Sequence, residues 1–473
     1  MAKLVSPGVR AGRKVVDDVE GDAREAKKQG KLVGWSSSKF PCELAEAFDL
    51  NVMYPENQAA GIAAQRDGEI MCQAAEDLGF DNDICGYARI SLAYAAGKRA
   101  SRKFDHETLE FIIDPNSGKP LKDENGKVVI DPETGKPKKD PKTQVPYTVL
   151  DDIHEIEALP ETTEKEIAYK NFRREAIKPY RQMRIPQPDF VLCCNNICNC
   201  MTKWYENIAR MCNIPLIMVD IPYNNTVEVS DSAVKYVRAQ FDNAIHELEK
   251  LTGKKFDEKK FELACKHANR TAQKWLNVCD FLQYKPAPMS GFDLFNHMAD
   301  VVTARGKEAA ADAFELLSKD LQKNIEEGTS TLPFPEQYRV MFEGIPCWPK
   351  LPNLFKPLKE NGINVTAVVY NNMDEMARAY YKAPNSVCIE QGVAWREGIC
   401  RDNKVDGVLV HYNRSCKPWS GYMAEMQRRF TADLGVPCAG FDGDQADPRN
   451  FNEAQYATRV QGLVEAMEAN KKD

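Results

Sequence analysis

The cysteines of this chain are densest in the run PDFVLCCNNICNC, which holds Cys193, Cys194, Cys198 and Cys200. Thiolates are soft, charged ligands that suit iron-sulfur clusters and zinc. The spacing C-C-x3-C-x-C, however, matches neither a zinc ribbon nor the tandem cysteines of bacterial ferredoxins. This run therefore does not encode a complete metal site, and a site here would need cysteines from distant loops.

A similar pattern of residues recurs near the C-terminus as VDGVLVHYNRSC. Asp189 corresponds to Asp406, and each copy places a cysteine just past its apolar stretch, Cys198 and Cys416. Each copy then continues through a segment of helical periodicity to a second apolar stretch. A match of this length indicates an internal duplication. The repeat selects Cys198 and Cys416 as candidate ligands, and the alternative is that each is a small buried thiol.

Apolar runs of strand length alternate with helix-period segments through most of the chain. The eight predicted strands are Lys31–Trp35, Leu50–Tyr54, Phe190–Cys194, Pro215–Ile221, Arg339–Glu343, Val365–Tyr370, Gly407–His411 and Cys438–Phe441. Strands that alternate with helices of ten or more residues predict parallel sheets covered on both faces. We predict an α/β protein of two doubly wound, flavodoxin-like lobes related by duplication, residues 1–230 and 336–473, with a helical segment at 231–335 between them.

Residues 101–146 differ in amino-acid composition from the rest of the first lobe and are rich in turn-forming residues. They contain two near-copies of one turn formula, IDPNSGKP at 113–120 and IDPETGKP at 130–137. Each copy combines an aspartate acceptor, a proline with fixed φ and a glycine that tolerates positive φ. We predict a hairpin-rich surface insertion without a catalytic role.

Polar side chains follow several of the predicted strands. In doubly wound sheets, ligands bind beyond the carboxyl ends of the strands. Ser37, Glu56, Cys198 and Cys416 all lie at such ends, in four separate loops. The alternative for Glu56 is a carboxylate that stabilises a helix N-terminus, and for Ser37 a turn residue. His411 ends a strand near Cys416, and as a lone histidine it is expected to be a core residue.

Composition excludes several classes of function. The formal charge is −7 with acidic and basic residues interspersed, which argues against a nucleic-acid partner or a membrane-binding patch. The first residues lack the apolar core of a signal peptide, and no stretch has the length of a spanning helix. We therefore expect a cytoplasmic protein, in which the 15 cysteines are not paired as disulfides.

Seven runs closely resemble the family of 2-hydroxyacyl-CoA dehydratases and benzoyl-CoA reductases, and together they span nearly the whole chain. They are VGWSSSKFPCELAEAF, YPENQAAGIAA, DICGYARISLAYAAG, PDFVLCCNNICNCMTKWYE, ADVVTARG, FEGIPCWPKLPNLFKPL and VDGVLVHYNRSCKPWSGYM. The runs SSSKFPCE and CCNNICNC are most similar to the larger (alpha) subunits that act on (R)-2-hydroxyglutaryl-CoA. The resemblance implies a hydro-lyase that forms (E)-glutaconyl-CoA and is oxygen-sensitive.

The implied chemistry explains why such an enzyme needs an electron. In a 2-hydroxyacyl thioester the C3 proton is barely acidic, and the C2 hydroxide is a poor leaving group beside a carbonyl. The resemblance implies that one recycled electron forms a ketyl radical, which overcomes both obstacles. It also implies a smaller beta subunit and a separate ATP-dependent iron-sulfur activator protein. This chain has no P-loop motif, which fits an external ATPase.

The resemblance also implies the site residues. Three cysteines, Cys85, Cys198 and Cys416, would hold a 4Fe-4S cluster with one iron open to substrate. Ser37 and Glu56 would lie beside the substrate. Cys193, Cys194 and Cys200 would then surround the cluster or lie in the core. Whether the complex also contains a flavin stays open.

Three further questions stay open on the sequence. The distal carboxylate of a glutaryl group needs a cation, and Arg89, Arg414 and Lys417 flank the presumed ligands. Related alpha subunits carry several more residues between Tyr370 and Asn371, so either this loop is short or a mobile segment is missing. The alternative functions are a dehydratase for another acyl-CoA, a benzoyl-CoA reductase-type subunit, and a non-catalytic subunit that carries a cluster.

Overall fold

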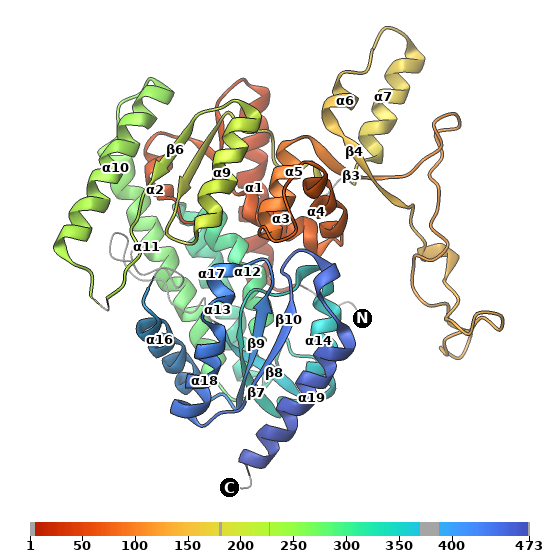
Figure 1. Cartoon of the computed structure of the whole chain (residues 1–473), viewed down its shortest axis with the longest axis vertical. Coiled ribbons are helices and arrows are strands. Elements are labelled where there is room, and N and C mark those ends of the chain that lie inside the picture. The colour runs from red at the N-terminus through yellow and green to blue at the C-terminus, as the bar shows by residue number, and fades with distance from the viewer. Residues whose placement is uncertain (1–4, 179–181, 227, 369–386, 472–473) are drawn as a thin grey trace.

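The chain folds around two four-stranded parallel sheets, with a separate two-stranded antiparallel hairpin (Figure 1). The computed structural model describes residues 5–178, 182–226, 228–368 and 387–471. All eight predicted strands are present, each close to its predicted bounds. Tyr370 and the loop that follows it lie outside the described residues. Among the described residues, no helix is long and apolar enough to span a membrane.

The first sheet has the strand order β2-β1-β5-β6. Its strands are β1 (Val33–Ser36), β2 (Asn51–Met53), β5 (Phe190–Cys194) and β6 (Leu216–Val219). Both faces of this sheet carry apolar side chains, which is why its strands read as continuous apolar runs. One face is covered by α3 (Pro55–Ala64), α4 (Gly68–Asp77), α5 (Gly86–Ala95) and α9 (Asn199–Cys212), and the other by α2 (Cys42–Ala47) and α10 (Asp231–Thr252).

The second sheet has the strand order β10-β9-β7-β8. Its strands are β7 (Tyr338–Glu343), β8 (Ile363–Val368), β9 (Gly407–Asn413) and β10 (Cys438–Gly443). The helices on one face are α12 (Gly291–Ala304), α14 (Leu351–Glu360) and α19 (Glu453–Asn470), and those on the other are α16 (Ile389–Asp402), α17 (Lys417–Ser420) and α18 (Met423–Leu434). Counted along the chain within each sheet, both sheets have the order 2-1-3-4.

The two aspartates of the sequence repeat make the same contacts in their sheets. The backbone N–H of Asp189 donates to the carbonyl of Val33 at 2.7 Å, and its carboxylate accepts from the N–H of Val33 at 2.9 Å. Asp406 and Arg339 repeat this pair of bonds at 2.7 and 2.8 Å. In each sheet the aspartate thus aligns the third strand with the first. The sequence repeat therefore corresponds to a repeated structural feature.

The predicted middle segment is helical, as expected. It contains α10, α11 (Glu258–Asp280), α12 and α13 (Glu308–Glu326), and α1 (Pro7–Lys28) from the N-terminal region packs against α12 and α13. At Gly8 of α1 an added Cβ would lie 2.4 Å from the Leu317 backbone, so only glycine permits this close approach. This helical layer brings Arg305, just past α12, against the first lobe, where its guanidinium donates to the carbonyl of Phe40.

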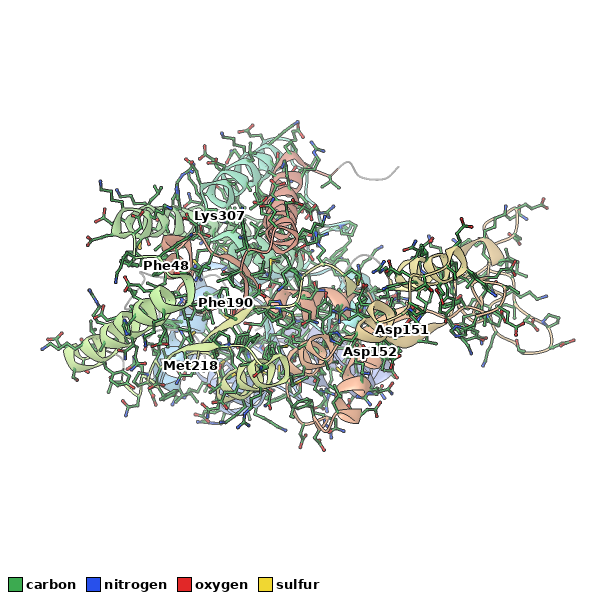
Figure 2. All side chains as sticks on the ribbon, turned by 90° about the horizontal axis from the view of Figure 1, so that it is seen from above. Phe48, Asp151, Asp152, Phe190, Met218 and Lys307 are labelled. Carbon is green, nitrogen blue, oxygen red and sulfur yellow. The ribbon has the colours of Figure 1, made fainter. Side chains whose placement is uncertain are left out.

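The predicted insertion extends away from the body of the molecule (Figures 1 and 2). Its base is the hairpin of β3 (Lys98–Arg102) and β4 (Thr148–Asp152), which the sequence analysis missed. Residues 103–147, which we call the arm, are joined by isolated bridges such as Ile130 to Pro137, as the turn formulas predict. Two helices, α6 (Ile153–Glu157) and α7 (Glu164–Ala176), follow the hairpin and lead back to the first sheet.

Candidate active site

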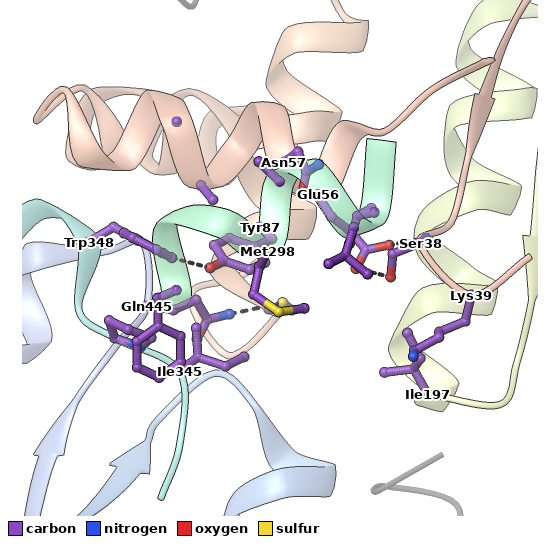
Figure 3. A pocket seen from close by; sticks show the side chains of 18 of the residues that line it. Ser38, Lys39, Glu56, Asn57, Tyr87, Ile197, Met298, Ile345, Trp348 and Gln445 are labelled. Carbon is purple, nitrogen blue, oxygen red and sulfur yellow. Dashed lines mark hydrogen bonds between the residues drawn. The ribbon is translucent and has the colours of Figure 1, made fainter. Parts of the chain in front are cut away.

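A cavity of about 340 Å³ lies where the carboxyl ends of the two sheets face each other (Figure 3). Its lining comes from both lobes and from the helical layer. The polar and sulfur-containing residues among those that line it include Ser38, Lys39, Glu56, Cys85, Cys198, Cys200, Arg305, Cys416 and Gln445. The cavity, which Glu20 also lines, therefore contains thiols, carboxylates and cations from segments far apart in the sequence.

The three predicted cysteine ligands all line this cavity. Each immediately precedes a helix: Cys85 precedes α5, Cys198 precedes α9 and Cys416 precedes α17. All three thiols therefore lie at helix N-termini. The backbone N–H groups there favour negative charge, which favours the thiolate form that binds metal.

Burial opposes the charged form of these thiols in the absence of a metal. It raises the pKa of Cys198 to about 12 and the pKa of Cys416 to about 11. Cys85 and Cys200 share a hydrogen bond, which raises the pKa of Cys85 and lowers that of Cys200 to about 7. Cys200, which the sequence analysis placed outside the ligand set, thus lies against Cys85 and lines the same cavity.

The donor set fits an iron-sulfur cluster. Among the described residues, no three His, Cys, Asp or Glu side chains converge closely enough to hold a single metal ion. A cluster makes a different demand, because each thiolate binds its own iron and the sulfurs need not meet at one point. The amide Nε2 of Gln445 also donates to Sγ of Cys85 at 3.2 Å, and hydrogen bonds to sulfur tune the potential of such clusters.

Glu56 lies across the cavity from Gln445, in the first turn of α3 (Figure 3). Its two carboxylate oxygens accept from the N–H of Ser38 at 2.7 Å and from the hydroxyl of Ser38 at 2.9 Å. Burial raises the pKa of Glu56, and the two bonds from Ser38 and the charge of Lys39 partly oppose this effect. A carboxyl group with a raised pKa, held in place by two hydrogen bonds, can accept and return a proton.

Ser37 is placed differently from the prediction. It is fully buried, and its hydroxyl accepts from the N–H of Cys194 at 3.2 Å, so it links β1 to β5. It is not among the residues that line the cavity, whereas the next residue, Ser38, is. A catalytic role for Ser37 stays a prediction, and the geometry favours Ser38 as the serine that faces a ligand.

Other predicted core residues lie where they were expected. Cys193 and Cys194 are fully buried in β5. His411 is also fully buried: its Nδ1 contacts the carbonyl of Ile345 at 2.6 Å, and its ring stacks on Phe441. Burial lowers the pKa of His411 to about 4, so it is neutral at physiological pH. This confirms a core role for His411.

The cations of the cavity are not those that the sequence suggested. Arg89 is fully buried and paired with Glu76 and Asp447, while Arg414 and Lys417 are exposed, and none of the three lines the cavity. Lys39 and Arg305 line it instead. Both lie in runs that carried the family resemblance, SSSKFPCE and ADVVTARG, so the sequence held a signal for them.

Comparison with known proteins places this architecture in a family. The family model for 2-hydroxyglutaryl-CoA dehydratase, D-component, matches residues 157–467. The chain belongs to this dehydratase family. Subunit alpha of (R)-2-hydroxyglutaryl-CoA dehydratase from Acidaminococcus fermentans is 69% identical, covering 99% of this chain and 99% of that protein.

Other relatives of the 2-hydroxyglutaryl-CoA dehydratase family differ in the substrate they are named for. The alpha subunit of (R)-phenyllactyl-CoA dehydratase from Clostridium sporogenes is 42% identical over 97% of this chain and 95% of that protein. Lactoyl-CoA dehydratase subunit alpha from Anaerotignum propionicum is 33% identical, over 95% and 94%. Family membership therefore identifies the chain as a dehydratase-family protein. The acyl group of its substrate has to be inferred from the cavity.

Proposed function

We propose that this chain is the alpha subunit of a hydro-lyase that removes water from (R)-2-hydroxyglutaryl-CoA to give (E)-glutaconyl-CoA. The observation that carries the proposal is the joint lining of one cavity by three thiols at helix N-termini, Cys85, Cys198 and Cys416, and by the Glu56 carboxylate. The similarity to the Acidaminococcus subunit over 99% of the chain supports the choice of substrate.

The cofactor we propose is a 4Fe-4S cluster held by these three cysteines, and a flavin elsewhere in the complex stays open. When bound, the cluster would supply one-electron chemistry at the thioester, with one iron free for a ligand. The protein surroundings then have two tasks. Aromatic residues that line the cavity, such as Trp204 and Trp348, keep water away from the reacting centre. Gln445 holds Cys85 through its hydrogen bond.

Proton transfer in this proposal belongs to Glu56. It would take the proton from C3 of the acyl chain once the hydroxyl has left, and the proton would then combine with the released hydroxide to complete the loss of water. Ser38 fixes the carboxylate through two hydrogen bonds and so sets the direction in which it faces. Ser37 contributes by joining β1 to β5 beneath the site.

The wider setting is part of the same proposal. The relatives are named as alpha subunits, which supports a smaller beta subunit as a partner. We further propose a separate ATP-dependent iron-sulfur activator protein as electron donor, and a cytoplasmic location. The matching strand orders and the paired aspartates support two flavodoxin-like, doubly wound lobes that arose by duplication, with the helical segment 231–335 between them.

The experiment is anaerobic purification of this chain with its beta subunit, followed by iron analysis and turnover assays. We expect about four irons for each subunit, as one 4Fe-4S cluster in each of the two subunits requires. We also expect release of glutaconyl-CoA from (R)-2-hydroxyglutaryl-CoA only when activator, reductant and ATP are present. Faster turnover of a monocarboxylic 2-hydroxyacyl-CoA would point to another dehydratase. Iron without turnover of any acyl-CoA would point to a non-catalytic cluster carrier.

A further inference from the structure

One end of the cavity carries positive charge. Lys39 directly follows Ser38 in the loop after β1, and its side chain extends into the cavity on the side of Ser38 and Glu56 (Figure 3). Gln445, which contacts Cys85, lies on the opposite side. We call the side with Gln445 and Cys85 the thiol end and the side with Lys39 the cationic end, and Glu56 lies on the lining beside the cation.

Lys39 has an unusual environment for a lysine. In the part of the chain that the structure describes, no side chain forms a hydrogen bond or an ion pair with its ammonium group. Burial, followed by the charge of Arg305, lowers the pKa of Lys39 to about 8. The Lys39 side chain is half-buried. A charge that is largely withdrawn from water and has no partner is costly, so a protein that keeps one usually pairs it with a ligand.

Arg305 strengthens the positive character of this end. It reaches the cavity from the loop after α12, and its Nε lies 3.8 Å from the carboxylate of Glu43. Glu46, the next carboxylate along α2, is paired with Lys307 at 2.9 Å. The Glu56 carboxylate is already bound by the N–H and the hydroxyl of Ser38. Its charge favours the Lys39 ammonium, but burial and Arg305 outweigh it and the pKa of Lys39 is lowered.

We propose that Lys39, with Arg305 beside it, binds the carboxylate at the far end of the substrate's acyl chain and selects dicarboxylic over apolar 2-hydroxyacyl groups. The inference rests on the proposed function, because it takes the thioester to lie at the thiol end. An acyl chain that runs from the thiol end to Lys39 passes Glu56, which is the residue proposed to take the C3 proton. Binding of the distal carboxylate would thus align C3 with its base.

A second role for Lys39 has to be separated from this one, because a buried lysine with a lowered pKa can also carry protons. A proton carrier would act on every substrate alike. A carboxylate-binding residue would act only on substrates that have the distal carboxylate. The two roles therefore differ in how a variant changes the substrate preference.

The first experiment compares the Lys39→Met variant with the wild-type complex on (R)-2-hydroxyglutaryl-CoA and (R)-2-hydroxyisocaproyl-CoA. We expect kcat/KM for the glutaryl substrate to fall about 100-fold, mostly through KM, because the substrate carboxylate loses its partner in a buried site. The rate with the isocaproyl substrate should stay the same or rise. Lys39→Arg should keep the glutaryl preference, and Lys319→Met, on the exposed face of α13, should change neither rate.

A fall in kcat of equal size on both substrates would overturn the proposal in favour of proton transfer, and unchanged kinetics would overturn it outright. A wild-type complex that turns over only the isocaproyl substrate would instead overturn the proposed function. A second measurement needs no variant: inhibition of the wild-type complex by glutaryl-CoA and by valeryl-CoA. These inhibitors have equal chain length, and we expect the dicarboxylic one to bind about 100-fold more tightly. Equal inhibition constants would contradict the proposal.

Discussion

Replacement of Glu56 by glutamine tests the proton-transfer role with little change in shape. The carboxylate accepts from both the N–H and the hydroxyl of Ser38. In Glu56→Gln the amide oxygen can still accept from the N–H, and the amide NH₂ can donate to the hydroxyl oxygen, because a serine hydroxyl also accepts. The side chain should therefore keep its position and lose only its charge and its ability to carry a proton.

The structure sets the size of the two expected effects. Exchanging two charge-assisted hydrogen bonds for neutral ones costs about 2 kcal/mol, and removing a buried charge offsets part of that cost. The free energy of unfolding should therefore change by no more than about 2 kcal/mol. Loss of a positioned acid-base group lowers kcat by about 10²–10⁴-fold, which is about 3–5 kcal/mol in the activation free energy.

The raised pKa of Glu56 adds a pH dependence with a defined sign. Between the ordinary pKa of glutamate and the raised value, the folded protein binds more protons than the unfolded chain, so stability falls as pH rises through this window. The Glu56→Gln side chain does not titrate, so the variant should not lose stability in this window. The free energy of unfolding of the variant relative to the wild type should therefore increase with pH. The wild-type rate should rise with pH as Glu56 becomes a base, and the variant should lack this rise.

The assay combines anaerobic turnover with urea unfolding at several pH values. Glu69→Gln provides the matched control, because Glu69 also lies in the first turn of a helix but is exposed and does not line the cavity. The control should keep wild-type activity. Turnover within threefold of the wild type in Glu56→Gln, at full iron content, would refute the proton-transfer role. Loss of iron or a destabilisation well above 2 kcal/mol would show that Glu56 is needed for structure.

Three further predictions follow from other parts of the molecule. The Cys198→Ala variant should lose most of its iron and its visible absorption. The control Cys212→Ala, at the other end of α9, should keep both. Full iron content in Cys198→Ala would exclude Cys198 as a ligand. Arg396→Met leaves the buried Glu343 carboxylate without the partner that it contacts at 2.9 Å, and should cost about 3–5 kcal/mol in urea unfolding. A cost below about 1 kcal/mol would contradict this reading. Replacing the arm by an Asn-Gly turn between β3 and β4 should leave turnover unchanged. It should cost no more than about 3 kcal/mol, because the arm has a single buried apolar side chain, that of Phe104. Loss of turnover would show that the arm has a functional role.

The core strands could be predicted from the sequence because parallel strands buried on both faces appear as continuous apolar runs. Phe190–Cys194 is such a run, and its predicted and observed bounds agree. The strand β3 was missed because its sequence, KRASR, is mostly charged, although its arginine at position 99 is buried beneath Tyr94. Burial of that kind depends on tertiary packing and leaves no periodicity in the sequence.

The candidate site could be predicted only in part. The repeat indicated Cys198 and Cys416, and the resemblance added Cys85. Which serine of the Ser36–Ser38 triplet faces the cavity depends on the turn geometry after β1, which composition does not reveal. Lys39 and Arg305 are 266 positions apart, and their proximity exists only because the helical layer folds against the first lobe.

The three candidate ligand thiols of the cavity come from three segments of the chain. Cys85 and Cys198 belong to the first lobe, and Cys416 belongs to the second. A fragment that ends before β7 would contain two of the candidate ligands without the third. A cluster held by these three cysteines, as proposed above, would therefore require both lobes in their folded arrangement. Its iron content would then report on the assembly of the whole molecule.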